Sequence, residues 1–130
     1  MPDEYRVADY AFPPVARRWN GFTLSVTARE ADYGVVMIAA QGELDLQTTP
    51  LLTRAFLTYR HQRLVLDLAP VTFCGVAGAR ALHTLSLIED HVALAASHPV
   101  RRVLEITGLG SSLRQYPAMA DAVRAVLPAS

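Results

Sequence analysis

The alternation of apolar and polar residues predicts a β-hairpin at the start of the patterned part of the chain. Residues 22–27 alternate between apolar and hydroxyl-bearing side chains, the two-residue period of a strand with one buried face at or near an edge. After a turn at Tyr33-Gly34, residues 35–40 are almost continuously apolar, as expected for a strand covered on both faces. The two segments should pair as an antiparallel hairpin.

Apolar residues at helical spacing predict about four helices after the hairpin. The first has Thr48 or Thr49 as its N-cap and Pro50 in its first turn. Its apolar residues define one buried face: Leu51, Leu52, Ala55, Phe56 and Tyr59. The second runs to about Ile88 and should bury the following set: Val76, Ala79, Leu82, His83 and Leu87.

The remaining two helices carry clear start and stop signals. The third opens at Ser97-His98-Pro99 and closes at Gly108 in the left-handed conformation, with three residues turned inward: Val100, Val103 and Leu104. Pro117 starts the last helix, whose buried face should contain Met119, Val123 and Leu127.

Two short apolar runs, residues 64–68 and 92–96, predict further buried strands between the helices, and residues 113–116 suit a short strand or a connector. Alternating strands and helices imply right-handed crossovers onto a parallel sheet. The expected fold is α/β: a mixed, mostly parallel sheet of 4–5 strands with an N-terminal antiparallel hairpin, packed by about four helices. We place this domain at residues 21–128 and expect residues 1–20 to form an irregular arm, because they hold three prolines and show no period.

Composition narrows the classes of function. The 130 residues are 52% hydrophobic and 18% charged, which fits one globular domain. Twelve basic residues balance twelve acidic ones, so no global field favours nucleic acid or an anionic membrane. No apolar run approaches the roughly 20 residues that cross a bilayer, and the acidic N-terminus is unlike a signal peptide. We expect a soluble cytoplasmic protein.

The sequence contains few candidate catalytic or metal-binding residues. Its one cysteine, Cys74, excludes an intramolecular disulfide and a multi-cysteine metal site, and its four histidines are scattered without ligand spacing. Cys74 lies just before a predicted helix start, where a thiolate and a redox role are conceivable, but a buried structural cysteine is the commoner case. We expect no catalytic residues, no cofactor and no metal.

Three separated segments together resemble the STAS domain, the family of anti-sigma factor antagonists. They are GELDLQT at residues 42–48, LVLDLAPVTF at 64–73 followed by GARAL, and SHPVRRVLEITGL at 97–109. The fold of that family, a mixed sheet packed by helices, agrees with the element order predicted above. The resemblance implies a non-enzymatic module that binds a kinase-like anti-sigma factor and so frees a sigma factor.

The resemblance also implies a switch that this chain lacks. In the family a serine or threonine at the start of the second helix, in a pattern like Asp-Ser-Ser-Gly, is phosphorylated, and the added charge disrupts the docked interface. Here the Asp position falls on Gly75, and the hydroxyl positions fall on Val76 and Ala77. Only Gly78 is retained, so Ala77, or Val76, is a degenerate phosphorylation position.

The partner-binding surface implied by the resemblance comprises the GELD turn and the start of the second helix: Asp45, Thr48, Gly75, Val76, Ala77, Gly78 and Arg80. Asp45 could instead only shape the turn into the first helix. Two alternatives stay open, namely a STAS subunit of a lipid-transport or signalling assembly, and an anion- or nucleotide-binding domain using the helix start at residues 75–78. The oligomeric state is open as well, a homodimer included.

Overall fold

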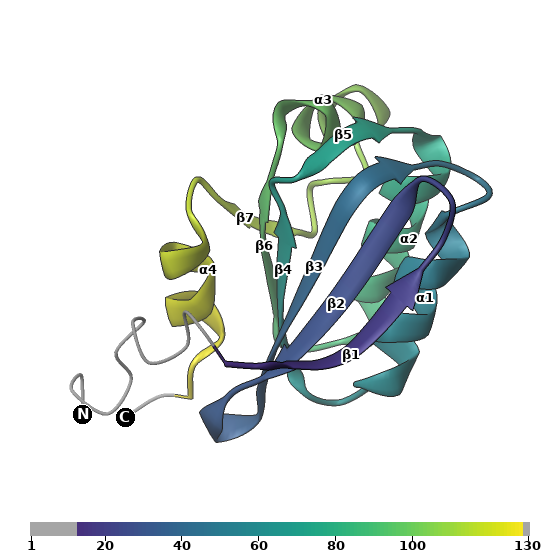
Figure 1. The fold of residues 1–130 in the computed structure, drawn as a ribbon. Coiled ribbons are helices and arrows are strands. Elements are labelled where there is room, and N and C mark those ends of the chain that lie inside the picture. The colour runs from purple at the N-terminus through teal and green to yellow at the C-terminus, as the bar shows by residue number, and fades with distance from the viewer. Residues whose placement is uncertain (1–12, 129–130) are drawn as a thin grey trace.

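A seven-stranded sheet forms the centre of the molecule, and helices cover both of its faces (Figure 1). The computed structural model describes residues 13–128. The strands are β1 (Val15–Asn20), β2 (Leu24–Glu30), β3 (Val35–Leu44), β4 (Arg63–Leu68), β5 (Val71–Cys74), β6 (Val92–Ala96) and β7 (Arg114–Tyr116). The helices are α1 (Thr49–Thr58), α2 (Val76–Ile88), α3 (His98–Thr107) and α4 (Met119–Val126), with a short 3-10 turn, η3 (Asp32–Gly34), between β2 and β3.

The predicted fold class is confirmed. The strand order is β1-β2-β3-β4-β6-β7, and β5 pairs with the end of β3. β2 and β3 form the expected antiparallel hairpin, whereas β3–β4, β3–β5, β4–β6 and β6–β7 pair in parallel. The four α-helices correspond to the four that were predicted, and Gly108 ends α3 with φ 71°.

Two strands were missed, so the expected count of 4–5 is too low. β1 occupies Val15–Asn20, inside the segment expected to be an irregular arm, and pairs antiparallel with β2. Its sequence does not alternate because four of its six residues are exposed. β5 has only four residues and follows β4 after a two-residue turn, so it lacks the length for a period-two signal. The rest of the expected arm, residues 1–12, lies outside the described part of the chain.

Two hydrophobic cores lie on opposite faces of the sheet. The larger one joins α1, α2 and α3 to the sheet through residues such as Leu52, Leu82 and Leu104, all essentially inaccessible to solvent. The smaller one packs α4 on the other face, where Val123 and Val126 meet β-strand residues that include Val65. In Figure 1 the yellow α4 and the teal α1 and α2 accordingly lie on different sides of the sheet.

The buried face of α2 differs from the predicted one. Gly78, Ala79, Leu82 and Leu85 are buried, whereas the expected inward residues Val76 and Leu87 are 47% and 67% exposed. α2 is apolar around most of its circumference, so spacing alone did not fix which side faces the sheet. This rotation leaves apolar side chains of α2 on the surface. None of the helices in the described segment is both long and apolar enough to span a bilayer.

Candidate functional site

Two strand-to-helix corners lie side by side at the carboxyl end of the sheet. The first corner (residues 44–49) joins β3 to α1, and the second corner (residues 73–78) joins β5 to α2. They are neighbours because β5 runs parallel to the end of β3, with Leu44 opposite Cys74. The backbone N–H of Gly75 donates to the carbonyl of Leu44 at 2.8 Å, which ties the two corners directly together.

In the first corner, side chains accept hydrogen bonds from the backbone N–H groups that precede α1. Asp45 Oδ1 accepts the backbone N–H groups of Gln47 and Thr48, both at 2.9 Å. Thr48 Oγ1 accepts the N–H of Asp45 at 2.9 Å in return, as in a capping box. Thr48 is the N-cap residue of α1, as predicted, although its side chain does not bond to the first turn of that helix. Asp45 instead caps the short turn that leads into α1.

Further hydrogen bonds lock this turn to the end of β3. The Thr48 hydroxyl donates to the carbonyl of Glu43 at 2.7 Å, and the Thr49 hydroxyl donates to that of Asp45 at 2.6 Å. The hydrogen bond from the Thr48 backbone is the main reason why the pKa of Asp45 is lowered, with smaller contributions from the Thr48 hydroxyl and the Gln47 backbone. Asp45 is thus a charged capping residue, and its Oδ1 is fully used inside its own turn.

In the second corner no side chain caps the helix. Gly75 is the N-cap residue of α2 and offers only its backbone, and the first turn, Val76-Ala77-Gly78, carries no acidic side chain. Gly78 is buried against the first corner: a Cβ placed on it would lie 2.9 Å from Cys74 Sγ and 3.1 Å from Leu44 Cβ. The glycine retained from the family pattern therefore allows α2 to approach the sheet closely.

Cys74 belongs to this packing. Its side chain is buried, and burial raises the pKa of the thiol to about 11. At neutral pH nearly all of it is the neutral thiol, which is a poor nucleophile. The geometry supports the structural interpretation of Cys74 over a redox role.

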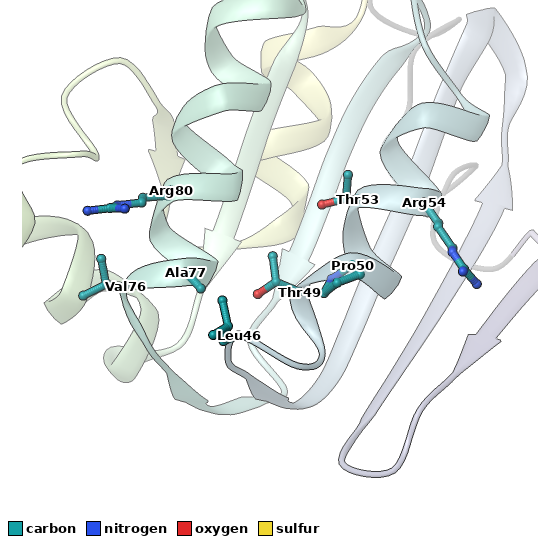
Figure 2. A pocket seen from close by; sticks show the side chains of 8 residues that line it. All are labelled: Leu46, Thr49, Pro50, Thr53, Arg54, Val76, Ala77 and Arg80. Atoms are coloured by element: carbon teal, nitrogen blue, oxygen red, sulfur yellow. The ribbon is translucent and has the colours of Figure 1, made fainter.

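A groove of about 840 Å³ opens between the two corners and the first turns of α1 and α2 (Figure 2). Its lining is mostly apolar or hydroxyl-bearing: Leu46, Thr49, Pro50, Thr53, Arg54, Val76, Ala77 and Arg80. Leu46 projects from the first corner with 81% of its side chain exposed, and Val76 from the second with 47% exposed. Figure 2 shows Arg54 and Arg80 on opposite sides of the groove, their guanidinium groups pointing away from it.

The seven predicted site residues lie in this one region, but only some of them line the groove. Val76, Ala77 and Arg80 line the groove. Thr48 and Gly78 are buried behind it. The half-buried Asp45 and Gly75 form the helix starts at its edge.

Sequence analysis missed five of the eight residues that line the groove: Leu46, Thr49, Pro50, Thr53 and Arg54 were not assigned to a surface. The available signal was the spacing of Leu46, Pro50 and Thr53, which follows a helical period on the side opposite the buried face of α1.

The chemistry available in this groove is that of binding. Val76 and Ala77 have no hydroxyl, and the Thr49 hydroxyl is engaged by the carbonyl of Asp45. Within residues 13–128, no three His, Cys, Asp or Glu side chains are grouped in a way that could hold a metal ion. The arrangement presents an apolar surface between two cations.

A family model matches the sequence of this chain. The family model described as "STAS domain" matches residues 27–122, which is more than half of the chain. The chain therefore belongs to the STAS domain family. Comparison with curated proteins gives no match.

The solved structures that are similar to the chain include two anti-sigma factor antagonists. One, from Mycobacterium paratuberculosis, has 28% sequence identity and a TM-score of 0.72, covering 80% of this chain and 94% of its own. The other, SpoIIAA in its unphosphorylated form, has 18% identity and a TM-score of 0.59, covering 79% of this chain and 99% of its own. The likeness to SpoIIAA is one of fold. Together these comparisons support a regulatory role for the domain.

Proposed function

We propose that this protein is an anti-sigma factor antagonist that binds a kinase-type anti-sigma factor without being switched off by phosphorylation of α2. Support for the antagonist role comes from membership of the STAS family and from the similar structure from Mycobacterium paratuberculosis. Support for the missing switch comes from α2, whose first turn presents Val76 and Ala77 on a groove instead of hydroxyl groups.

The observation that carries the proposal is the apolar groove at the two joined corners. Leu46 and Val76 line the same groove, one from each corner, and both side chains are largely exposed. Burying such apolar surface against a partner is favourable by about 25 cal/mol per Å². A partner docked there needs no phosphate-sensitive group on this chain. The protein would then stay in the form that corresponds to a binding-competent antagonist.

A charge placed in the groove tests the binding surface. We expect Ala77→Asp to weaken binding to the anti-sigma factor by tenfold or more in a titration, since an uncompensated carboxylate would be desolvated in the interface. Ala118→Asp is the matched control, because Ala118 is exposed at the start of α4 on the opposite face of the sheet. Equal affinities for the wild type and Ala77→Asp would contradict the proposed surface.

Restoring the family pattern tests the missing switch. Incubation of the wild type with the anti-sigma kinase and ATP should give no phosphoprotein by intact mass spectrometry. The triple variant Gly75→Asp, Val76→Ser, Ala77→Ser should gain one phosphate and lose binding after phosphorylation. Gly75 has room for the change, since the nearest atom to an added Cβ is 3.6 Å away. A stoichiometric phosphate on the wild type would overturn this part of the proposal.

A further inference from the structure

The exposed sides of α1 and α2 form two matched stripes that extend well beyond the corners. One stripe contains Leu46, Pro50, Thr53 and Leu57, and the other contains Ala77, Ala81, Thr84 and Ile88. Both follow the spacing i, i+4, i+7, i+11, which places each set on one side of a helix with the period of a coiled-coil seam. The stripes therefore run along the helices in step with each other.

The space between the stripes continues the groove toward the carboxyl ends of the two helices. A second hollow of about 190 Å³ shares Thr53 with the first and is lined further along by Leu57 and Ile88. These two large side chains are 55% and 48% exposed. The two hollows, called the channel below, together follow α1 along its ten residues, roughly 15 Å at 1.5 Å per residue.

The charged residues that line the two hollows are both arginines, Arg54 and Arg80. Neither α1 nor α2 contains an aspartate or glutamate, although the whole chain has twelve acidic and twelve basic residues. Arg54 and Arg80 flank the channel, and neither guanidinium makes a hydrogen bond or ion pair with another described residue. Asp45 lies next to Leu46 in sequence, but its Oδ1 accepts hydrogen bonds within its own turn.

We infer that the channel between α1 and α2 receives an amphipathic helix of the partner, with an apolar stripe facing the channel and acidic residues along its flanks. A third helix fits because two parallel helices with apolar residues repeating at intervals of three and four residues offer the holes into which its side chains pack. The outward guanidinium groups of Arg54 and Arg80 would then meet carboxylates at the sides of that helix.

The charges also argue against a second copy of this chain as the occupant. A two-fold symmetric contact through the same face would bring Arg54 and Arg80 of both copies together with no acid from either α1 or α2 between them. Like charges placed together in an interface oppose association. The two arginines therefore favour an acidic partner over a second copy of this chain. This inference rests on the proposed function in that it specifies the docking element of the binding partner.

The direct test is a pair of synthetic helical peptides and the full-length chain. Both peptides are 14 residues long, with leucines repeating at intervals of three and four; one carries glutamates and the other lysines at the flanking positions. Fluorescence anisotropy should show binding of the glutamate peptide, at least tenfold weaker binding of the lysine peptide, and loss of this preference at high salt. Failure of the glutamate peptide to bind, or equal binding of both, would overturn the inference.

Substitutions on the protein locate the contact. The double variant Arg54→Glu, Arg80→Glu should lose the glutamate peptide and gain affinity for the lysine peptide. The matched control Arg101→Glu, Arg102→Glu changes the same charge on exposed residues of α3 and should bind like the wild type. Leu57→Ala should weaken binding several-fold, whereas Ile106→Ala, which removes a still more exposed apolar side chain from α3, should not.

Two experimental outcomes would distinguish failure of this inference from failure of the proposed function. If Ala77→Asp weakens anti-sigma factor binding but the Arg54→Glu, Arg80→Glu variant does not, the antagonist role stands and the acidic helix is refuted. If the glutamate peptide binds with the expected charge dependence while the wild type binds no anti-sigma factor, the inference stands and the antagonist role fails. A dimer seen by light scattering that dissociates in Leu57→Asp would show a second copy in the channel and overturn the inference.

Discussion

The two corners solve the same structural problem in opposite ways. Each must turn a strand end into a helix start, and they share a hydrogen bond between Leu44 and Gly75. The first corner does so with polar side chains, because Asp45 and Thr48 bond reciprocally to the backbone. The second corner has no capping side chain at all and depends on small residues, with Gly78 allowing α2 to pack on Cys74.

The residues that hold the two corners in place differ from those on the proposed binding surface. Thr48 and Gly78, which hold the corners in place, are buried, whereas Leu46, Val76 and Arg80 face the groove. A phosphorylation switch would need a hydroxyl at the second corner, and this chain has only alkyl groups there. Each corner therefore combines a buried support, Thr48 or Gly78, with an exposed apolar side chain, Leu46 or Val76, that carries no modifiable group.

The largest effect should come from crowding the second corner. Gly78→Val places new carbons where Cys74 Sγ lies at 2.9 Å and Leu44 Cβ at 3.1 Å, so the helix or the strand must shift. We expect a loss of about 3 kcal/mol in the free energy of unfolding, measured by urea denaturation. Gly75→Ser is the matched control at the same corner and should keep wild-type stability, because its Cβ meets nothing closer than 3.6 Å. Equal stability of the two variants would refute the close approach.

A smaller loss should follow removal of a hydroxyl from the first corner. Thr48→Val keeps the side-chain shape but removes the donor to the Glu43 carbonyl and the acceptor for the Asp45 N–H. With Thr48 only 6% exposed, the loss of these bonds should cost about 2 kcal/mol by urea denaturation. Thr53→Val, on an exposed position of α1, should stay within about 0.5 kcal/mol of the wild type. A neutral Thr48→Val would mean that the turn does not depend on its side chains.

The smallest effect should appear only as a change with pH. The pKa of Asp45 is lowered from its ordinary value of 3.8 in the folded state, so its stabilising effect is present above that value and is lost as the pH falls through the folded pKa. Asp45→Asn keeps a capping oxygen but not the charge. The stability difference between variant and wild type should therefore shrink below about pH 4 in urea titrations at several pH values. A difference independent of pH would contradict the charged cap.

The sequence predicted those strands and helices whose apolar pattern matches the burial of their side chains. Residues 64–68 and 92–96 lie between parallel neighbours, and their unbroken apolar runs identified them as strands. β1 escaped prediction because it lies at the edge and most of its side chains are exposed, so pairing with β2 rather than hydrophobicity defines it. The orientation of α2 was also not predicted, since nine of its thirteen residues are apolar or glycine and their spacing is compatible with more than one buried side.

The location of the candidate site could be predicted from the sequence. Which of its residues face the groove and which support the fold could not. Resemblance to the family placed Asp45, Val76 and Ala77 in one region, and the structure brings them together because β5 lies beside β3. Spacing along one helix cannot show that Leu46 and Thr53 share a groove with residues of another helix, since that depends on how α1 and α2 pack. Nor could it show that Asp45 is bonded to its own turn, which is a matter of side-chain geometry.

The edges of the sheet carry a consequence for behaviour at high concentration. β1 forms one edge, bears the exposed Arg17 and Arg18, and has an irregular register between Val15 and Arg17. The other edge, β7, is only three residues long. Basic side chains, an interrupted ladder and a short strand all discourage another sheet from adding to an edge. Concentrated solutions of the folded protein should therefore resist fibril formation through strand pairing, and self-association should be governed by the helical faces.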